Sequence, residues 1–427
     1  MYARQHKDNG QAMDVAAHRS TTSRAPRAWL ACLLLIAAGA WTGVGAQTAD
    51  SGLLVLHADG ALFFNNNEYT GSHVSGYTLP GFVLRPMVEW RLAPRFSLQG
   101  GASWLHYWGN DGFPRRRHSE VMPAAGDTTY SYHIAPWLQA RADVTPWLSV
   151  VLGSLVNPDG HRLPMPLYEQ ERLYAVDPEA GVQLLVDHRY VQVDAWVDWI
   201  DFIWVESRRQ ESFNAGLTLL PTLPFGDGRW EASVPVYAIV HHDGGERLAD
   251  SSATHKSRYN LAAGLSLGCC IDSLRLKAEA LALRYSRTGP TPQPLVYDEW
   301  GCLRSAPGEP KEGWGAFASL KAAYRDASAD ISYWTSERFV PLLGNYHFSN
   351  TSMTIDDLTF DRIGVIALRA QYIWHFGPCA MAVRGAYYHY MPTTGDRKDY
   401  WKCSFPAEDM FSFGIFMWFR PTVTLIK

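Results

Sequence analysis

The sequence has few charged residues and almost no long apolar run. Only 19% of the 427 residues are charged, against roughly 25% in ordinary soluble proteins. The net charge of -4 lacks the basic excess of a general nucleic-acid binder, so no nucleic-acid partner is expected. Mean hydropathy is -0.17, and only residues 28–41 are continuously apolar, which excludes a bundle of membrane helices. Aromatic residues, by contrast, make up 13% of the chain. This combination fits a membrane β-barrel.

The first 46 residues are expected to be a leader with a secretory signal peptide. Arg19, Arg24 and Arg27 precede the apolar run, and the small residues Val44-Gly45-Ala46 follow it. The run is short for a spanning helix, which needs about 20 apolar residues, although an uncleaved anchor is the alternative. Residues 47–427 are then expected to form a single domain.

Sixteen segments after the leader alternate apolar and polar residues, which is the pattern of half-buried strands. Fourteen or eighteen strands stay open as alternatives, because segment boundaries shift by a few residues. The segments are 52–66, 79–92, 95–108, 130–143, 147–156, 179–188, 190–203, 212–222, 229–242, 257–269, 273–287, 314–325, 328–337, 361–376, 379–391 and 408–420.

The connections between these segments alternate between short turns and longer polar loops. Ala93-Pro94 and Gly377-Pro378 are examples of the short set, and 109–129 and 157–178 of the long set. Short turns on one side and long loops on the other are typical of outer-membrane barrels. The sequence therefore predicts an all-β, transmembrane, antiparallel up-and-down barrel of about sixteen strands, surrounded by the lipid of a bacterial outer membrane.

Charged residues recur on the faces of the strands that oppose the apolar faces. In 314–325 the apolar face includes Trp314, Leu320 and Tyr324, whereas Lys321 lies on the other face. Charges of both signs in one interior require a wet or tightly paired lumen, and a barrel of this size leaves an aqueous channel. The expected pore-lining residues are Arg85, Glu89, Arg141, Asp194, Asp198, Arg275, Lys277, Glu279, Lys321, Arg369 and Arg384.

The last segment carries a recognisable order of residues. Ser412-Phe413-Gly414-Ile415-Phe416-Met417-Trp418-Phe419 resembles the assembly signal in the last strand of bacterial outer-membrane barrels. The resemblance implies the barrel assembly machinery as a partner. The signal usually ends at an aromatic residue near the chain end, whereas here Arg420 to Lys427 follow, so the end of the barrel is less well defined than the strand.

The layout resembles that of bacterial porins, in which the loop between the fifth and sixth strands folds inward and narrows the channel. The corresponding residues 157–177 mix charged and apolar side chains, and apolar surface suits a loop packed against a barrel wall. The alternative is an external loop that covers the mouth. The charged members of this expected constriction are Asp159, Arg162, Glu169, Glu171 and Arg172.

The resemblance implies diffusion of small polar solutes through the barrel, with self-association into a homo-oligomer left open. An outer-membrane enzyme or a substrate-specific binding channel with rim residues is the alternative, and a barrel plugged by its loops is a third. No cofactor and no metal site are expected, because the sequence has neither His-Glu-x-x-His nor Cys-x-x-Cys.

Three further local patterns could carry function. Gly264-Leu265-Ser266-Leu267-Gly268 spells a serine-hydrolase motif, but it lies inside an alternating segment with no helix after it. The basic cluster at 115–118 is either an anion-attracting site or a solvated charge run. Cys302 and Cys403 lie in long loops on the same side, where a disulfide between them is allowed.

Overall fold

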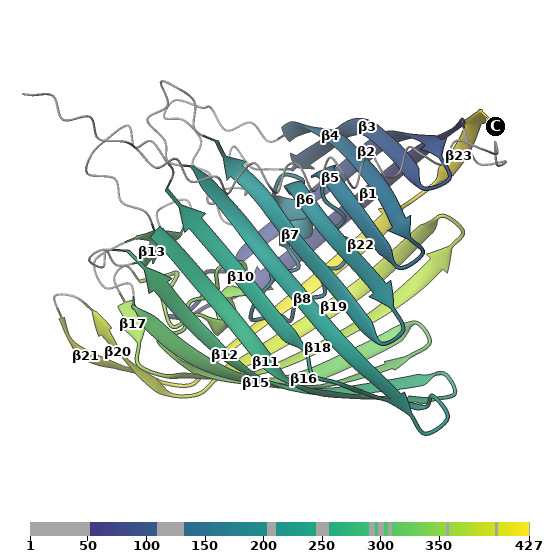
Figure 1. The fold of residues 1–427 in the computed structure, drawn as a ribbon. Helices are drawn as coiled ribbons and strands as arrows, with labels where there is room; N and C mark the ends of the chain where they lie inside the picture. The colour runs from purple at the N-terminus through teal and green to yellow at the C-terminus, as the bar shows by residue number, and fades with distance from the viewer. Residues whose placement is uncertain are drawn as a thin grey trace, which may run out of the picture. The chain divides into compact units, whose positions relative to one another are not determined.

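A computed structural model describes residues 52–108, 132–202, 211–244, 256–289, 295–297, 303–305, 310–355, 358–397 and 400–426. Within these ranges the main sheet has 18 antiparallel strand segments (Figure 1). They are β1 (Leu53–Glu68), β2 (Tyr77–Ala93), β3 (Phe96–Tyr107), β4 (Tyr132–Thr145), β5 (Leu148–Ser154), β6 (Ala180–His188), β7 (Val191–Asp201), β8 (Ser212–Phe225), β9 (Trp230–Ser233), β10 (Val236–Asp243), β11 (Lys256–Ile271), β12 (Leu274–Thr288), β15 (Glu312–Tyr324), β16 (Ala327–Glu337), β18 (Ile363–Phe376), β19 (Cys379–Tyr390), β22 (Glu408–Phe419) and β23 (Thr422–Ile426).

The sheet is a closed barrel that the chain crosses sixteen times, as predicted. Two crossings are interrupted at prolines, β9 and β10 at Pro235 and β22 and β23 at Pro421, because proline has no N–H for the strand ladder. β1 pairs with β2 on one edge and with β22 and β23 on the other, which closes the ring. Each strand therefore has two hydrogen-bonded neighbours, and no open edge is left within the described barrel.

Alternation along the strands gives the barrel an apolar exterior. Leu62, Leu138 and Leu265 are 48%, 66% and 68% exposed although they are large and apolar. A closed sheet with an apolar outer face satisfies its backbone hydrogen bonds internally and is suited to hydrocarbon, and the protein lies in the bacterial outer membrane. Among the described residues, no helix is long and apolar enough to cross a membrane.

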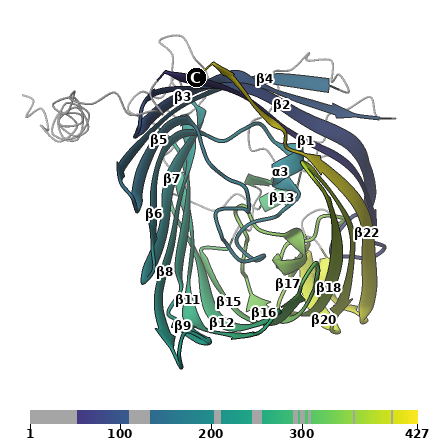
Figure 2. The same ribbon diagram turned by 90° about the vertical axis from the view of Figure 1, so that its right-hand side faces the viewer.

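Two connections on the long-loop side are directed into the barrel. Loop 3 (residues 155–179) joins β5 to β6 and contains the short helix α3 (Arg172–Ala175), which lies inside the ring of strands in Figure 2. Loop 7 (residues 338–362) joins β16 to β18 and contains the 3-10 helix η1 (Tyr346–Phe348) and β17 (Leu358–Phe360). β17 pairs with β20 (Thr393–Arg397), which pairs with β21 (Tyr400–Phe405), and β13 (Leu295–Tyr297) pairs with β14 (Leu303–Ser305).

An apolar core fills part of the lumen between these two loops and the inner wall. Leu167 of loop 3 and Phe339 of loop 7 are fully buried in one cluster with wall residues such as Trp334 and Val365. Residues 338–360 are one of the longer connections that the sequence predicts to be polar, but Phe339–Leu343 are apolar and pack inward. Burial of this apolar surface fixes both loops inside the barrel.

Candidate functional site

Loop 3 enters the lumen and is attached to strands on either side of its own base. At its base, Leu155 N–H donates to Glu179 O at 2.8 Å, which holds the two ends of the loop together. On one side of this base, the hydroxyl of Tyr107 on β3 donates to Tyr174 O at 2.6 Å, and Arg85 on β2 donates to Leu173 O at 3.3 Å. On the other side, His161 contacts β7 and β8, so the loop is held against the inner wall from β2 to β8.

Backbone hydrogen bonds join loop 3 to loop 7. Glu169 N–H donates to Leu343 O at 2.8 Å, and Asn345 N–H donates to Met165 O at 3.0 Å. Gly344 lies between these contacts, and a Cβ there would be only 2.1 Å from Pro166 O. The absence of a side chain at Gly344 is what allows the two loops to approach so closely.

A buried histidine attaches the first half of loop 3 to the wall. His161 is 0% exposed, and its imidazole lies 2.9 Å from Asp194 on β7 and 2.8 Å from Glu179. Burial disfavours the charged imidazole, yet the two carboxylates outweigh it and raise the pKa of His161 to about 9. Glu179 is also desolvated, but the pairing with His161 prevails and lowers the pKa of Glu179 to about 2. At neutral pH His161 is therefore protonated and Glu179 is ionised, and this ion pair holds loop 3 against the wall.

The backbone at this point is strained. Gly160, His161 and Arg162 all have positive φ, at 74°, 55° and 58°. Residues other than glycine adopt this conformation at a cost of about 1 kcal/mol or more. The hydroxyl of Thr218 on β8 donates to His161 O at 2.8 Å, so the wall holds the strained peptide as well as the imidazole.

Two cavities lie on either side of loop 3. The turn-side cavity has a volume of about 1160 Å³ and reaches the short turns, and the loop-side cavity has a volume of about 640 Å³ and reaches loops 1 (residues 69–76) and 7. Pro158, Gln170, Tyr174 and Arg384 border both cavities. These four residues therefore mark the narrow passage between the two halves of the lumen.

Eight of the residues expected to line the pore border these cavities. Arg85, Glu89, Arg141 and Arg384 border the turn-side cavity, and Lys277, Glu279, Lys321, Arg369 and again Arg384 border the loop-side cavity. The other three border neither. Asp194 is covered by His161, Asp198 accepts a hydrogen bond from Ala180 N–H at 2.8 Å, and Arg275 faces inward on β12 below Lys277.

Four of the five charged residues expected in the constriction, Asp159, Arg162, Glu169 and Glu171, border the loop-side cavity. Arg172 is instead buried in α3, with its guanidinium 5.7 Å from the Tyr168 ring. Burial, reinforced by the Glu171 charge and opposed by Arg369 on the wall, raises the pKa of Glu169 to about 7. Acidic groups of the loop thus face a basic wall across this cavity.

Arg384 at the narrow passage is held by aromatic rings. Its guanidinium lies 4.4 Å from the Phe416 ring and 5.1 Å from the Trp418 ring, both on β22. Within the described residues its Nε is buried without a hydrogen-bond partner. Cation–π contact fixes the position of the charge without neutralising it.

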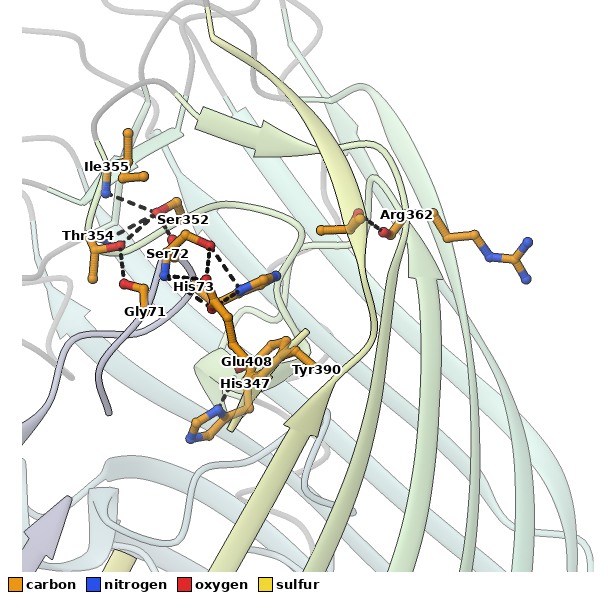
Figure 3. A network of polar contacts seen from close by, with 11 residues as sticks. Gly71, Ser72, His73, His347, Ser352, Thr354, Ile355, Arg362, Tyr390 and Glu408 are labelled. Carbon is orange, nitrogen blue, oxygen red and sulfur yellow. Dashed lines mark hydrogen bonds and ion pairs between the residues drawn. The ribbon is translucent and has the colours of Figure 1, made fainter. Parts of the chain in front are cut away.

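A polar cluster missed by sequence reasoning joins loop 1 to β22 (Figure 3). The Ser72 hydroxyl donates to Glu408 at 2.8 Å, and His73 Nδ1 lies 2.8 Å from the same carboxylate. The His73 ring stacks on Phe360 at 4.0 Å, and Ser72 and His73 are 8% and 3% exposed. Ser72, His73 and Glu408 are residue types found in hydrolase active sites. Their burial, however, favours a structural role, in which they hold loop 1 against loop 7.

A second polar group faces outward, toward lipid, at the long-loop end of β19 and β22. His389 Nδ1 lies 2.8 Å from Asp409, and the Tyr387 hydroxyl donates to the same carboxylate at 2.5 Å. Asp409 is 62% exposed, and Phe411, the next outward residue on β22, is an apolar residue of the lipid-facing wall. The carboxylate orients the histidine and leaves its Nε2 directed away from the pair.

The remaining sequence patterns contribute no further site among the described residues. Ser266 lies within β11 opposite Glu279 and Ser233, so the Gly-x-Ser-x-Gly pentad forms no nucleophile elbow. The basic cluster at 115–118 and Cys302 lie outside the described ranges, and the Cys302–Cys403 disulfide stays a prediction. No group of three or more His, Cys, Asp or Glu in the described part is arranged around a metal position.

Comparison with known proteins identifies a family and a set of similar folds. A model of the family described as Lipid A 3'-O-deacylase-type matches residues 46–427. No curated protein matches the chain. A loop-deletion mutant of OmpT, an outer membrane protein of Vibrio cholerae, is 12% identical with a TM-score of 0.44, over 87% of this chain and 100% of that one.

Two further solved structures are similar to the same extent. OccK8 (OprE) of Pseudomonas aeruginosa is 11% identical with a TM-score of 0.44, over 88% of this chain and 100% of that one. OccAB1 of Acinetobacter baumannii is 10% identical with a TM-score of 0.44, over 89% of this chain and 98% of that one.

Proposed function

The chain belongs to the Lipid A 3'-O-deacylase-type family, and we propose that its barrel is a narrow outer-membrane channel for small polar solutes. Loop 3 is the constriction of this channel. The turn-side cavity is the vestibule on the side of the short turns, and the loop-side cavity is the vestibule on the side of the long loops.

The observation that supports this proposal is the charge lining of both cavities. Glu89 and Arg91 form an ion pair at 2.9 Å in the turn-side cavity, and Arg369 pairs with Asp330 at 3.0 Å in the loop-side cavity. Charged groups in a protein interior are stable only when they are paired or hydrated. A water-filled path past loop 3 explains why so many of them lie in the lumen rather than on the outer wall.

Single-channel recording in a planar bilayer tests the proposal. Purified, refolded protein should give stepwise conductance, and deletion of Leu163–Leu173 should increase the conductance of each step. Tyr174→Ala, which removes a ring at the narrow passage, should increase it by a smaller amount. Folding of each variant is checked by different migration of unboiled and boiled protein on a detergent gel. A correctly folded wild-type barrel without conductance would contradict the channel.

A second candidate function is hydrolysis of an acyl ester of an outer-leaflet lipid, favoured by the family and by the outward His389–Asp409 pair. His389, oriented by Asp409, would take a proton from water through Nε2 while the water oxygen attacks the ester carbonyl. The proton then passes to the departing alkoxide, which yields a free fatty acid and an alcohol.

Mass spectrometry of vesicles that contain lipid A distinguishes the two functions. Loss of one acyl chain from the lipid should require His389 and should disappear in His389→Gln. His375→Gln is the control, because His375 is exposed beside a short turn, at the end of the barrel away from His389. Equal activity of the two variants would exclude His389 as the base.

A further inference from the structure

We propose that the lumen wall carries a binding site for small oxyanions, carboxylate or phosphate groups, centred on Lys321. The inference rests on the proposed channel, because a solute reaches this wall through the lumen. The site belongs to the loop-side cavity, which Lys277, Ser319, Lys321 and Arg369 all border.

Strand register brings the charges of this site to one level. Lys277 on β12 is directly opposite Lys321 on β15, Lys321 is opposite Asp330 on β16, and Asp330 is opposite Arg369 on β18. Residues in direct register on one face have Cβ atoms about 4.5–5.5 Å apart. Four charged side chains from four consecutive strands thus form a continuous row along the wall.

The two carboxylates near this row are already engaged by other groups. Asp330 accepts a hydrogen bond from Arg369 Nε at 3.1 Å and forms an ion pair with the same guanidinium at 3.0 Å. Glu279 lies 3.6 Å from the Lys277 ammonium and accepts a hydrogen bond from Tyr237 at 3.2 Å. Each acid is therefore matched with a cation of its own.

Lys321 is the cation of this row that is left without a carboxylate partner among the described residues. No described carboxylate lies within ion-pair distance of its ammonium, and the charges that act on it are Asp330 and three cations, Arg369, Lys277 and Arg275. Arg369, Lys277 and Arg275 outnumber the two acids, Asp330 and Glu279, each of which is already paired, so the potential at Lys321 is positive. Like charges held together in this way attract a mobile anion and repel a mobile cation.

The chemistry of the site favours an oxyanion that is loosely held. The Lys321 ammonium provides three donors and the Ser319 hydroxyl lies on the same face of β15, so a carboxylate or phosphate finds several donors together. The Lys321 side chain is exposed to the cavity, which allows exchange with solution. Burial raises the pKa of Glu169 in loop 3 to about 7, which reduces the opposing charge of this residue near neutrality.

Reversal potentials in a potassium chloride gradient test the site. The wild-type channel should prefer chloride to potassium several-fold, Lys321→Gln should reduce the preference, and Lys321→Glu should reverse it. Lys402→Glu makes the same charge change at an exposed lysine outside the lumen and should leave the preference unchanged. Potassium acetate and potassium phosphate, each mixed with chloride, should block part of the chloride current, and the stronger blocker identifies the preferred oxyanion.

The outcomes separate this inference from the channel itself. Conductance steps that are cation-selective, or unaltered by Lys321→Glu, would overturn the anion site and leave the channel standing. If no steps occur, thermal unfolding in detergent still decides binding: inorganic phosphate should raise the unfolding temperature of wild type and Lys402→Glu, but not of Lys321→Glu. Equal shifts in all three, at equal ionic strength, would reject the site.

Discussion

The imidazole Nδ1 of His161 lies 2.9 Å from Asp194 Oδ2, so a loop inside the lumen is tied to a strand of the wall by a buried ion pair. The pair sits where the loop-3 backbone has positive φ, and the His161 ring stacks on Trp196 with a centroid distance of 4.4 Å. His161 is therefore one of the side chains that hold loop 3 in its position inside the barrel.

Removal of this side chain should release loop 3 and destabilise the protein. His161→Ala leaves Asp194 and Glu179 buried without their partner, and breaking such a pair typically costs about 3–5 kcal/mol. We expect a lower free energy of unfolding in urea and a higher conductance. His375→Ala, at an exposed histidine 3.7 Å from Asp326, should change the unfolding free energy by less than about 1 kcal/mol.

The same pair predicts how stability depends on pH. Protonated His161 contributes fully below its ordinary pKa of 6.5, and the contribution is lost as pH rises through about 9. Ionised Glu179 contributes above its ordinary pKa of 4.5, and that contribution is lost as pH falls through about 2. The difference in unfolding free energy between wild type and His161→Ala should be largest between these ordinary values. A difference that is constant from about pH 6 to about pH 10 would contradict the assignment.

Separating loop 3 from loop 7 should expose both loops. In Gly344→Val the new Cβ would meet Pro166 O at 2.1 Å and Pro166 C at 2.5 Å, and backbone atoms cannot move aside easily. We expect faster cleavage by trypsin after Arg162, which is already exposed, and a rise in conductance. Gly385→Val is the matched control, because nothing lies within 4 Å of a Cβ at that position. Identical cleavage of the two variants would show that the loops do not depend on this contact.

Asn350 should be the residue on which the fold of loop 7 depends most. Its amide oxygen accepts from the Ser336 hydroxyl at 2.7 Å and from Phe339 N–H at 3.0 Å, and its amide nitrogen donates to Phe360 O at 3.1 Å. Asn350→Ala would leave these buried groups unpaired, at a cost of about 1–3 kcal/mol for each. Urea unfolding should show this loss, whereas Asn66→Ala, on the outer face, should have little effect.

The strands could be predicted from sequence because their signal is local. Alternation in 314–325 and a predicted turn at Asp326 and Ala327 place β15 and β16, to within a residue, without any knowledge of the rest of the chain. The facing of Lys321 follows from the same period of two. Local patterns do not, however, show which inward charges are covered, and Asp194 is hidden only because a residue of loop 3 binds it.

The Ser72–His73–Glu408 cluster and loop 7 show what local reasoning misses. Ser72 and Glu408 meet because the first and last strands close the barrel, and no spacing in the chain records this. Loop 7 did carry a signal. Phe339-Val340-Pro341-Leu342-Leu343 is as apolar as the part of loop 3 that was expected to fold inward, and the same criterion applied there predicts its burial.

The pairing of β1 with β22 also has a consequence for how the protein is made. Gly60, in the first strand of the barrel, finds its partner Phe419 only after every intervening strand has been synthesised and exported. Before that moment the growing sheet has two unsatisfied edges that can pair with other chains. A truncated copy keeps those edges permanently and remains a target for aggregation or proteolysis. Only a chain that contains both β1 and β22 can therefore close the barrel and remove these edges.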